Sequence, residues 1–409
     1  MDKSRLRATF TGYYGMNNFG DDLFGVVCSA AARKYWNGEP KLAGPVIRGV
    51  DARYTMPSWY PSSLYGAPGP LGKASRLYSF ARGLSGADVL VMGGGSVIGG
   101  STNTSFRRKM MVSAHRTGKL KLAAIGVSIG PVVNAAAEDA VADFLGCLDY
   151  IAVRDRRSYD LAVKLGATEK TLLGRDLAGL LPSIAAVSSH VPRRAAEHSG
   201  NGAIRLGIAL CNYKVTGSYA APDRQGLLSA MTGELVRLAA LRPLQVDIFS
   251  LNEHPLHGDH ALAAMLEQNL LACGVAAQVR RYSGRSPLVM VEAIGECDAF
   301  ISARLHGAIV AYLQGVPFAI VDYHPKCNDF ADEVGLPRTL RITAEGDLPA
   351  AIRNALETML GPGCRPTLSH ELYAQQAQDI FRCAPWSAVV EIQAEVIGAS
   401  TSLAGEGAR

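Results

Sequence analysis

The sequence predicts an α/β protein with two doubly wound, Rossmann-like domains that face a cleft. Three observations support this prediction. Short apolar segments alternate with helical segments along most of the chain, as in proteins with parallel sheets. Glycine-rich or basic residues follow several of these segments, where ligands bind beyond the carboxyl ends of parallel strands. A pattern-free stretch rich in Ser, Ala, Pro and Arg interrupts the alternation near the middle of the chain.

The same pattern predicts how the chain divides. We predict an N-terminal domain over residues 1–183, a linker over 184–203, a C-terminal domain over 204–345 and a helical tail over 346–409. The 409 residues suffice for two domains of ordinary size. Hydrophobic residues make up 48% and charged residues 19% of the chain, which is a balance typical of globular proteins.

Charge and cysteine content narrow the class of protein and its compartment. The net charge of +5 is mild and no motif indicates nucleic acid, so an anionic small substrate or a phospholipid surface suits it better. No apolar stretch is long enough to span a bilayer, and the first residues have no secretory pattern. Eight scattered cysteines without a CxxC pair indicate reduced thiols, so we expect a cytoplasmic protein.

A glycine-rich segment follows the first predicted strand. That strand covers residues 7–11, the segment GYYGMNNFGDD covers 12–22, and a predicted helix covers 23–35. Glycines let the backbone approach a ligand closely, and a helix N-terminus offers free N–H groups and positive potential. The segment is neither a dinucleotide-binding fingerprint nor a phosphate-binding P-loop. Asp21 or Asp22 is favoured as the helix N-cap over a catalytic base.

The next part of the chain combines a predicted loop with a buried strand. Residues 40–79 are rich in Pro, Gly, Ser and Tyr and indicate a surface loop, apart from a strand predicted over 46–50. The strand predicted over 87–92 precedes a glycine-rich turn at 93–96. This turn therefore lies at a carboxyl end of the predicted sheet.

Arg154 follows a predicted strand over 149–153 and points toward the same sheet edge. Its planar guanidinium suits phosphate or carboxylate. The structural alternative is an Arg154–Asp155 pair, with Ser158 as the N-cap of the following helix. The sequence leaves both interpretations open.

In the second half, polar side chains again follow predicted strands. Asn212 lies past the strand over 205–211, and a loop at 252–260 follows the strand over 245–250. Three histidines at a spacing of three in this loop invite a zinc interpretation. A proline and a glycine make the segment a loop, and no second ligand cluster is evident, so we predict no metal site. His254 remains a candidate for the cleft.

The segment SARLHGAIVAYLQGVPFAIVDYHPK at 302–326 carries the strongest candidates. Arg304 and His306 stand at the carboxyl end of a strand predicted over 297–301, before a helix predicted over 308–314. A fixed cation and a group that exchanges protons near neutral pH then share one ligand edge. In the alternative, His306 caps the turn while Arg304 pairs with a carboxylate.

Taken together, these motifs resemble the polysaccharide pyruvyl transferase family. The shared elements are, in family order, GYYGxxNxGDD at 12–22, GGGS at 93–96, SIGP at 128–131, VRDxxS at 153–158, the aspartate Asp176 before a Pro-closed turn, and the RLH, GVP and YHPK elements of 302–326. The resemblance spans roughly residues 7–336. It does not clearly extend through 40–79 or the tail, where we place the choice of acceptor.

The resemblance implies a glycosyltransferase-B-like fold, with the acceptor on the N-terminal domain and phosphoenolpyruvate on the C-terminal domain. It implies transfer of pyruvate from phosphoenolpyruvate to two hydroxyls of a sugar as a cyclic ketal, in exopolysaccharide or cell-surface glycan biosynthesis, without a cofactor. His306 is the expected general acid/base and forms the catalytic pair with Arg304. The expected substrate-binding residues are Arg154, Lys326, Asn17, Asp21, Gly94, Gly95, Ser96, Asn212, His254 and Tyr323.

Two other classes of function stay open at this point. A glycosyltransferase that uses a nucleotide sugar would employ a similar cleft, but the sequence shows no motif that indicates a uridine or guanine pocket. A non-catalytic binding protein of a glycan pathway would be expected to lose Arg304 or His306, and both are present. Whether the saccharide acceptor is nucleotide-, lipid- or polymer-linked is open, as is contact with the inner face of the membrane. No amphipathic anchor stands out in the sequence.

Overall fold

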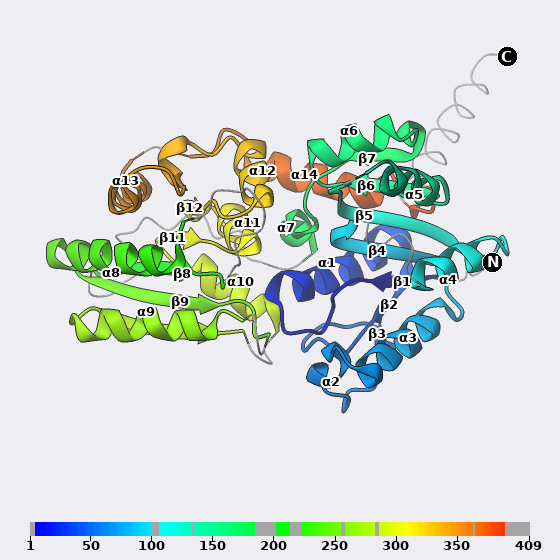
Figure 1. Cartoon of the computed structure of the whole chain (residues 1–409), viewed down its shortest axis with the longest axis horizontal. Coiled ribbons are helices and arrows are strands. Elements are labelled where there is room, and N and C mark those ends of the chain that lie inside the picture. The colour runs from blue at the N-terminus through cyan, green and yellow to red at the C-terminus, as the bar shows by residue number, and fades with distance from the viewer. Residues whose placement is uncertain are drawn as a thin grey trace, which may run out of the picture.

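Two parallel β-sheets, one in each half of the sequence, form the framework of the protein (Figure 1). The computed structural model describes residues 5–99, 106–132, 134–184, 202–212, 222–254, 258–282, 286–362 and 365–388. Within these residues the strand order is β3-β2-β1-β4-β5-β6-β7 in the first sheet and β10-β9-β8-β11-β12-β13 in the second. Every strand pair is parallel, as the alternation of strands and helices predicts.

The first sheet and its helices form the first half of the molecule. Its strands are β1 (Leu6–Thr11), β2 (Gly38–Ala43), β3 (Arg53–Tyr54), β4 (Val89–Ile98), β5 (Lys121–Ile129), β6 (Tyr150–Val153) and β7 (Thr171–Leu173). Its helices are α1 (Phe19–Trp36), α2 (Ser62–Gly66), α3 (Pro70–Leu84), α4 (Phe106–His115), α5 (Ala135–Gly146), α6 (Arg156–Lys164) and α7 (Leu181–Ile184), with a 3₁₀ turn, η3 (Leu177–Leu180), before α7.

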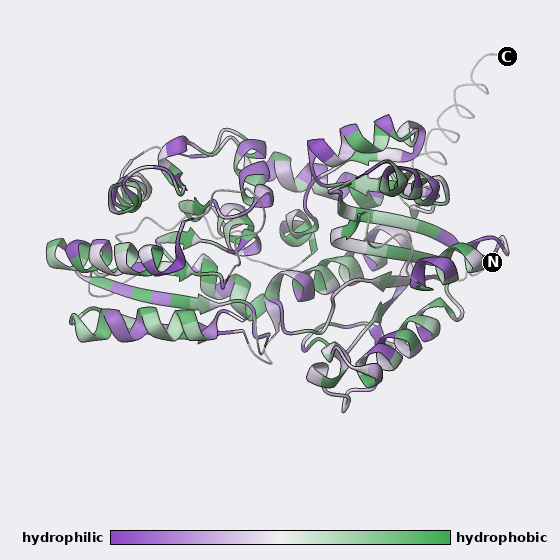
Figure 2. Cartoon of the chain, viewed as in Figure 1, coloured by the Kyte–Doolittle hydropathy of each residue, from purple (hydrophilic) through white to green (hydrophobic). Residues whose placement is uncertain are grey.

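The second sheet forms the second half. Its strands are β8 (Ile204–Ala209), β9 (Leu244–Ser250), β10 (Ala276–Arg281), β11 (Ala299–Ser302), β12 (Phe318–Val321) and β13 (Arg341–Ile342). Its helices are α8 (Arg224–Leu241), α9 (His260–Ala272), α10 (Pro287–Gly295), α11 (Leu305–Leu313), α12 (Pro325–Glu333) and α13 (Leu348–Leu360). Figure 2 shows hydrophobic residues along the central strands and mixed residues along the outer helices α8 and α9, because only one side of such a helix faces the sheet.

Helix α14 (His370–Arg382) returns from the second half and packs on the first. The ring of Phe381 lies 4.6 Å from that of Trp36, and the Tyr150 hydroxyl donates to the Ile380 carbonyl at 2.9 Å. Figure 1 shows α14 beside α7, which it contacts. The tail therefore buries part of the first half. Most of the predicted linker and the end of the predicted helical tail lie outside the described residues.

Two predicted elements of the first half are wrong. Residues 46–50 form no strand, because Gly49 has φ +74° and closes a turn there, and the strand is the preceding β2. Residues 93–96 form no turn either, since β4 continues to Ile98. Gly94 and Gly95 have φ of +78° and +84°, and the pairing with β5 shifts between Gly95 and Ile98. The glycines thus form a bulge that bends the strand.

Candidate active site

The loops of both halves meet around one cavity of about 170 Å³. In the first half, its walls are the start of α1, the end of β4 and the residue after β6. In the second half, they are residues that follow β9, β11 and β12. The lining residues are Asn18, Phe19, Gly20, Asp21, Phe24, Gly95, Ser96, Arg154, Leu251, Arg304, Leu305, His306 and Lys326. The cavity lies where parallel sheets of this type bind ligands, beyond the carboxyl ends of their strands.

The start of α1 joins the two halves. The Phe19 amide donates to the Leu251 carbonyl at 2.9 Å, and the Tyr282 hydroxyl donates to Asp22 Oδ2 at 2.8 Å. Helix α1 begins at Phe19 after Asn18, so Asp21 and Asp22 lie in its first turn and neither is the N-cap. The N-terminus of α1 thus borders the cavity and adds positive potential to it.

His306 lies in the first turn of α11 and faces the first half. Its Nε2 is buried without a hydrogen-bond partner, 3.7 Å from Asp176 Oδ2. Its ring meets Phe24 edge-on, with centroids 4.8 Å apart. Its Nδ1 lies against Gly20, where an added Cβ would come within 1.9 Å of that nitrogen. Gly20 therefore leaves the space that the imidazole occupies.

Asp176 and Arg154 form a buried ion pair behind this imidazole. Arg154 donates from one guanidinium nitrogen to Asp176 Oδ2 at 2.9 Å and from Nε to Ser128 Oγ at 2.8 Å. Burial opposes ionisation of Asp176, yet His306 and Arg154 hold the pKa of this carboxyl at about 2. Asp176 is therefore a carboxylate that lies between the guanidinium of Arg154 and the imidazole of His306.

The alternative Arg154–Asp155 pair is wrong, and so is the assignment of Ser158 as N-cap. Asp155 itself caps α6 by accepting from the Ser158 amide at 2.8 Å. Its other oxygen accepts from Ser128 Oγ at 2.6 Å, and Ser128 in turn contacts Arg154. The side chain of Asp155 thus supports Arg154 only through Ser128.

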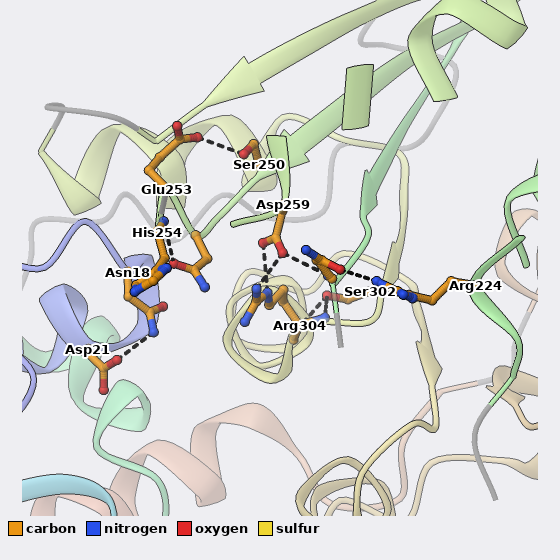
Figure 3. A network of polar contacts seen from close by, with 11 residues as sticks. Asn18, Asp21, Arg224, Ser250, Glu253, His254, Asp259, Ser302 and Arg304 are labelled. Atoms are coloured by element: carbon orange, nitrogen blue, oxygen red, sulfur yellow. Dashed lines mark hydrogen bonds and ion pairs between the residues drawn. The ribbon is translucent and has the colours of Figure 1, made fainter. Parts of the chain in front are cut away.

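Arg304 is held by a second buried carboxylate, Asp259. Its Nε donates to Oδ2 at 2.8 Å and one terminal nitrogen donates to Oδ1 at 2.5 Å (Figure 3). The Asn212 amide donates to the same Oδ1 at 3.1 Å. Burial raises the pKa of Asp259, although Arg304 opposes this shift. The expected alternative for Arg304, a pair with a carboxylate, is thus present, and within the described residues one terminal nitrogen keeps no partner.

Lys326 differs from both arginines because it has no paired carboxylate among the described residues. Its ammonium lies 5.8 Å from the centroid of the Tyr323 ring. Burial lowers the pKa of Lys326, and the charges of Arg304 and Arg154 act in the same direction. An anion in the cavity would relieve both effects.

Asp21 is the acidic residue that lines the cavity. It accepts from Asn18 Nδ2 at 2.6 Å (Figure 3). Burial raises the pKa of Asp21, while His306, Lys326, Arg154 and Arg304 all oppose that shift. Its carboxyl group therefore lies within electrostatic reach of the four basic side chains.

The cavity brings together seven of the predicted site residues: His306, Arg304, Arg154, Lys326, Asp21, Gly95 and Ser96. Gly94 does not line the cavity, because it packs against Phe24. A Cβ added at Gly94 would stand only 2.3 Å from the Phe24 ring. Asn17 does not line the cavity either. Its left-handed backbone, with φ 55°, directs it to a neighbouring cavity of about 200 Å³. There, its Nδ2 donates to Ser62 at 3.2 Å. The cavity holds Asn18 instead.

Three more predicted residues lie outside the cavity. The Asn212 amide holds Asp259, and Tyr323 is buried beneath Lys326. The His254 amide donates to Asn252 Oδ1 at 3.1 Å. Of the described residues, no group of three or more His, Cys, Asp or Glu is arranged to hold a metal ion. His257 of the predicted loop lies outside the described residues.

Sequence reasoning missed Asp259, Asn18 and Gly20 as parts of the site, and it left Asp176 without a role. The signal for Asp176 was its place in a family motif after a strand. For Asn18, the motif GYYGxxNxGDD itself aligns its asparagine with position 18 rather than 17. Asp259 and Gly20 carried no local signal, because their importance comes from contacts distant in sequence.

Solved structures share this architecture at low sequence identity. The UDP-GlcNAc 2-epimerase from Methanocaldococcus jannaschii aligns with a TM-score of 0.56 and 10% identity, over 93% of this chain and 99% of that chain. The UDP-GlcNAc 2-epimerase from Neisseria meningitidis, bound to UDP-GlcNAc, aligns with a TM-score of 0.52 and 11% identity, over 93% and 98%. At such identities the likeness shows the fold alone: a two-domain, glycosyltransferase-B-like α/β protein, as predicted.

The family follows from the sequence. The model of the polysaccharide pyruvyl transferase family matches residues 18–325, which is most of the chain. The protein therefore belongs to the polysaccharide pyruvyl transferase family and is a transferase, which confirms the predicted family and reaction class. The glycosyltransferase alternative is not favoured, because its structural support is distant. Curated proteins gave no match.

Proposed function

We propose that the protein transfers pyruvate from phosphoenolpyruvate to two hydroxyls of a saccharide, forming a cyclic ketal and releasing phosphate. The observation that carries the proposal is the ammonium of Lys326, which no carboxylate of the described residues pairs, in a cavity that Arg154 and Arg304 also line. Asp176 and Asp259 already balance the two arginines, so Lys326 supplies the uncompensated charge. Phosphoenolpyruvate carries phosphate and carboxylate on one small molecule, and the free guanidinium edges with Lys326 can bind both.

The reaction balances as follows. A proton adds to C3 of phosphoenolpyruvate, which becomes a methyl group, while the oxygen of the first sugar hydroxyl bonds to C2. The oxygen of the second hydroxyl then bonds to C2 as the C2–O bond to phosphate breaks. One hydroxyl proton replaces the proton given to C3, and the other leaves with phosphate. This chemistry needs no cofactor and no metal.

We assign the proton transfers to His306. Its Nδ1 is the ring nitrogen that remains available at the cavity, beside Gly20. Asp176 lies 3.7 Å behind Nε2 and orients the ring, so that the ring can pass a proton to C3. Asp176 does not line the cavity and acts through His306 as a positioning residue. Asp21, at the start of α1, is placed to accept a hydrogen bond from an acceptor hydroxyl.

The proposal extends to the acceptor and the compartment. Membership of the family supports a saccharide acceptor in exopolysaccharide or cell-surface glycan biosynthesis. We propose a lipid-linked saccharide, modified in the cytoplasm at the inner face of the membrane. No helix among the described residues is long and apolar enough to cross a bilayer.

Phosphate release tests the reaction. Purified protein is incubated with phosphoenolpyruvate and a panel of sugar acceptors, with His306→Ala as the control. We expect acceptor-dependent release that His306→Ala lowers by about 10²–10⁴-fold, the usual contribution of a general acid/base, without change in the circular dichroism spectrum. Near-normal turnover by that variant would refute the role of His306.

Calorimetry tests donor binding separately from turnover. We expect phosphoenolpyruvate to bind, and Lys326→Met to weaken binding by roughly 10- to 100-fold, because one hydrogen bond to a charged group is lost. Arg338→Met is a matched control, since Arg338 is an exposed cation that does not line the cavity. Equal binding by the wild type and Lys326→Met would contradict the donor site.

A further inference from the structure

One stretch of the chain carries most of the positive charge. Residues 52–137 contain ten Lys and Arg but a single acidic residue, Asp88. Asp88 is itself bonded to Arg7 at 2.6 Å. This stretch therefore has a net charge of +9, while the whole chain has +5, so the remaining residues sum to −4. The mild overall charge conceals a strong asymmetry.

The charged stretch builds α2, α3 and α4, which lie along the outer side of the first half (Figure 1). Helix α3 contacts both α2 and α4. Lys73 on α3 and Arg107 and Lys109 on α4 are exposed, and among the described residues their side chains have neither an ion pair nor a hydrogen bond. These three cations are free to meet an external anion.

Helix α3 has its apolar side outward. Apart from Phe80, its buried residues are small: Gly72, Ser75, Ser79 and Gly83. This lets the helix approach the sheet: a Cβ at Gly83 would stand 3.2 Å from Thr9. The outward side carries Leu71, Leu77 and Tyr78, which are 60%, 39% and 54% exposed. An ordinary surface helix shows the reverse arrangement.

Two more exposed hydrophobic side chains lie on segments that contact α3. Trp59 is 78% exposed next to Tyr60, whose hydroxyl is hydrogen-bonded to Ser75 of α3, and Phe106 is 63% exposed at the start of α4, which packs against α3. We call the outward side of α3, with Trp59 and the start of α4, the α3 face. It combines a tryptophan, a tyrosine and leucines with three cations that have no partner in the described part of the chain.

We propose that the α3 face docks on an anionic phospholipid bilayer. Trp, Tyr and Leu side chains gain free energy by entering the headgroup region, and lysines and arginines at the same level attract anionic lipid. A soluble polyanion would use the cations but would give Leu71 and Leu77 no apolar environment. The presence of exposed apolar side chains and cations on the same helix therefore favours a membrane as the partner.

The α3 face adjoins the site through a second cavity. Ser58 and Tyr60, on either side of Trp59, line the 200 Å³ cavity together with Asn17 and Asp22. Asn18 and Asp21, from the same segment, line the active-site cavity. Docking would thus place the membrane beside this second cavity, which leads to the start of α1. This role rests on the proposed function with a lipid-linked acceptor, whereas the docking itself does not.

Vesicle co-sedimentation tests the docking with the full chain. The probes are vesicles of phosphatidylcholine alone and of phosphatidylcholine with phosphatidylglycerol. We expect binding to the anionic vesicles only, and Lys73→Glu/Arg107→Glu/Lys109→Glu to weaken it by about 100-fold, at roughly fivefold for each cation removed from the surface. The control Arg242→Glu/Arg338→Glu/Arg365→Glu makes the same charge change at exposed positions of the second half and should leave binding unchanged.

A second variant tests the apolar part. Trp59→Ser/Leu71→Ser/Tyr78→Ser should weaken binding at least tenfold, since each side chain loses its transfer into the interface. Leu241→Ser/Leu271→Ser/Leu372→Ser alters exposed leucines elsewhere and should have no effect. Equal effects of test and control variants, or binding to a soluble acidic polysaccharide that the apolar variant leaves intact, would overturn the proposal. Phosphate release on a soluble acceptor should be unchanged in both test variants, so failed docking and failed catalysis give different results.

Discussion

The two halves of the molecule each hold an arginine at the cavity with a buried aspartate, yet the two pairs differ. Asp259 contacts Arg304 and the Asn212 amide, all within the second half. Asp176 contacts Arg154 within the first half and also faces His306 of the second. The pKa values differ accordingly, since burial raises that of Asp259 while that of Asp176 is held at about 2.

The difference shows what a second basic partner does for a buried carboxylate. One arginine leaves much of the cost of burying Asp259 uncompensated, whereas Arg154 and His306 together compensate that of Asp176. The Arg304–Asp259 pair therefore orients a binding group. The Arg154–Asp176 pair also acts on the imidazole and couples the two halves at the reacting centre.

Neutralising each aspartate in turn should produce the largest contrast. We expect Asp176→Asn to lower kcat on the order of 100-fold, because the carboxylate that orients and supports the imidazole is lost. Asp259→Asn should instead raise KM for phosphoenolpyruvate and change kcat little, because Arg304 loses the carboxylate that orients it. An equal fall in kcat for the two variants would refute the distinction.

Gly20→Ala disturbs the contact between Gly20 of the first half and the Nδ1 side of the His306 ring, opposite the side that faces Asp176. The new Cβ would stand within 1.9 Å of His306 Nδ1, so the ring must move away. We expect kcat to fall about tenfold, because a small displacement of a catalytic group is costly. Gly233→Ala, inside α8 with open space around its Cβ, is the matched control and should keep full activity. Normal kcat in Gly20→Ala would show that the position of this ring does not limit turnover.

Acid unfolding should reveal a smaller difference between the pairs. The lowered pKa of Asp176 means that its contribution to the free energy of unfolding is complete above about pH 4 and is lost as the pH falls to about 2. This contribution is about 2–3 kcal/mol. Asp176→Asn should therefore flatten the acid limb of stability, measured by denaturant unfolding at several pH values.

Asp259→Asn should not flatten that limb. The pKa of Asp259 is raised in the folded protein, so its contribution is present at low pH and is lost as the pH rises through the folded value. If the two variants flatten the acid limb equally, the electrostatic contrast between the pairs is wrong.

The sequence predicted the framework well because its signals are local. The alternation of apolar runs with helices placed β1, β6, β9 and β11 to within a residue or two. The prediction of a strand over 46–50 is wrong because a short apolar run does not reveal the turn at Gly49. The prediction of a turn at 93–96 is wrong because glycines also occur in bulges inside strands.

The site was predicted only in part. Arg304, His306 and Lys326 lie in one segment, and a family motif marks them as a group. Asn17 was chosen over Asn18, although the backbone at Asn17 turns its side chain to another cavity. Asp259 had no motif of its own and acquires its importance from Arg304, 45 residues away.

The sequence by itself determined the α/β class, the family and the basic groups at strand ends, because these follow from local patterns and motifs. Only the tertiary structure decided which aspartate holds which arginine, that His306 reaches Asp176 across the halves, and that the apolar side of α3 faces outward. The physical reason is that pairing, burial and exposure depend on which distant segments meet, and a linear pattern does not contain those contacts.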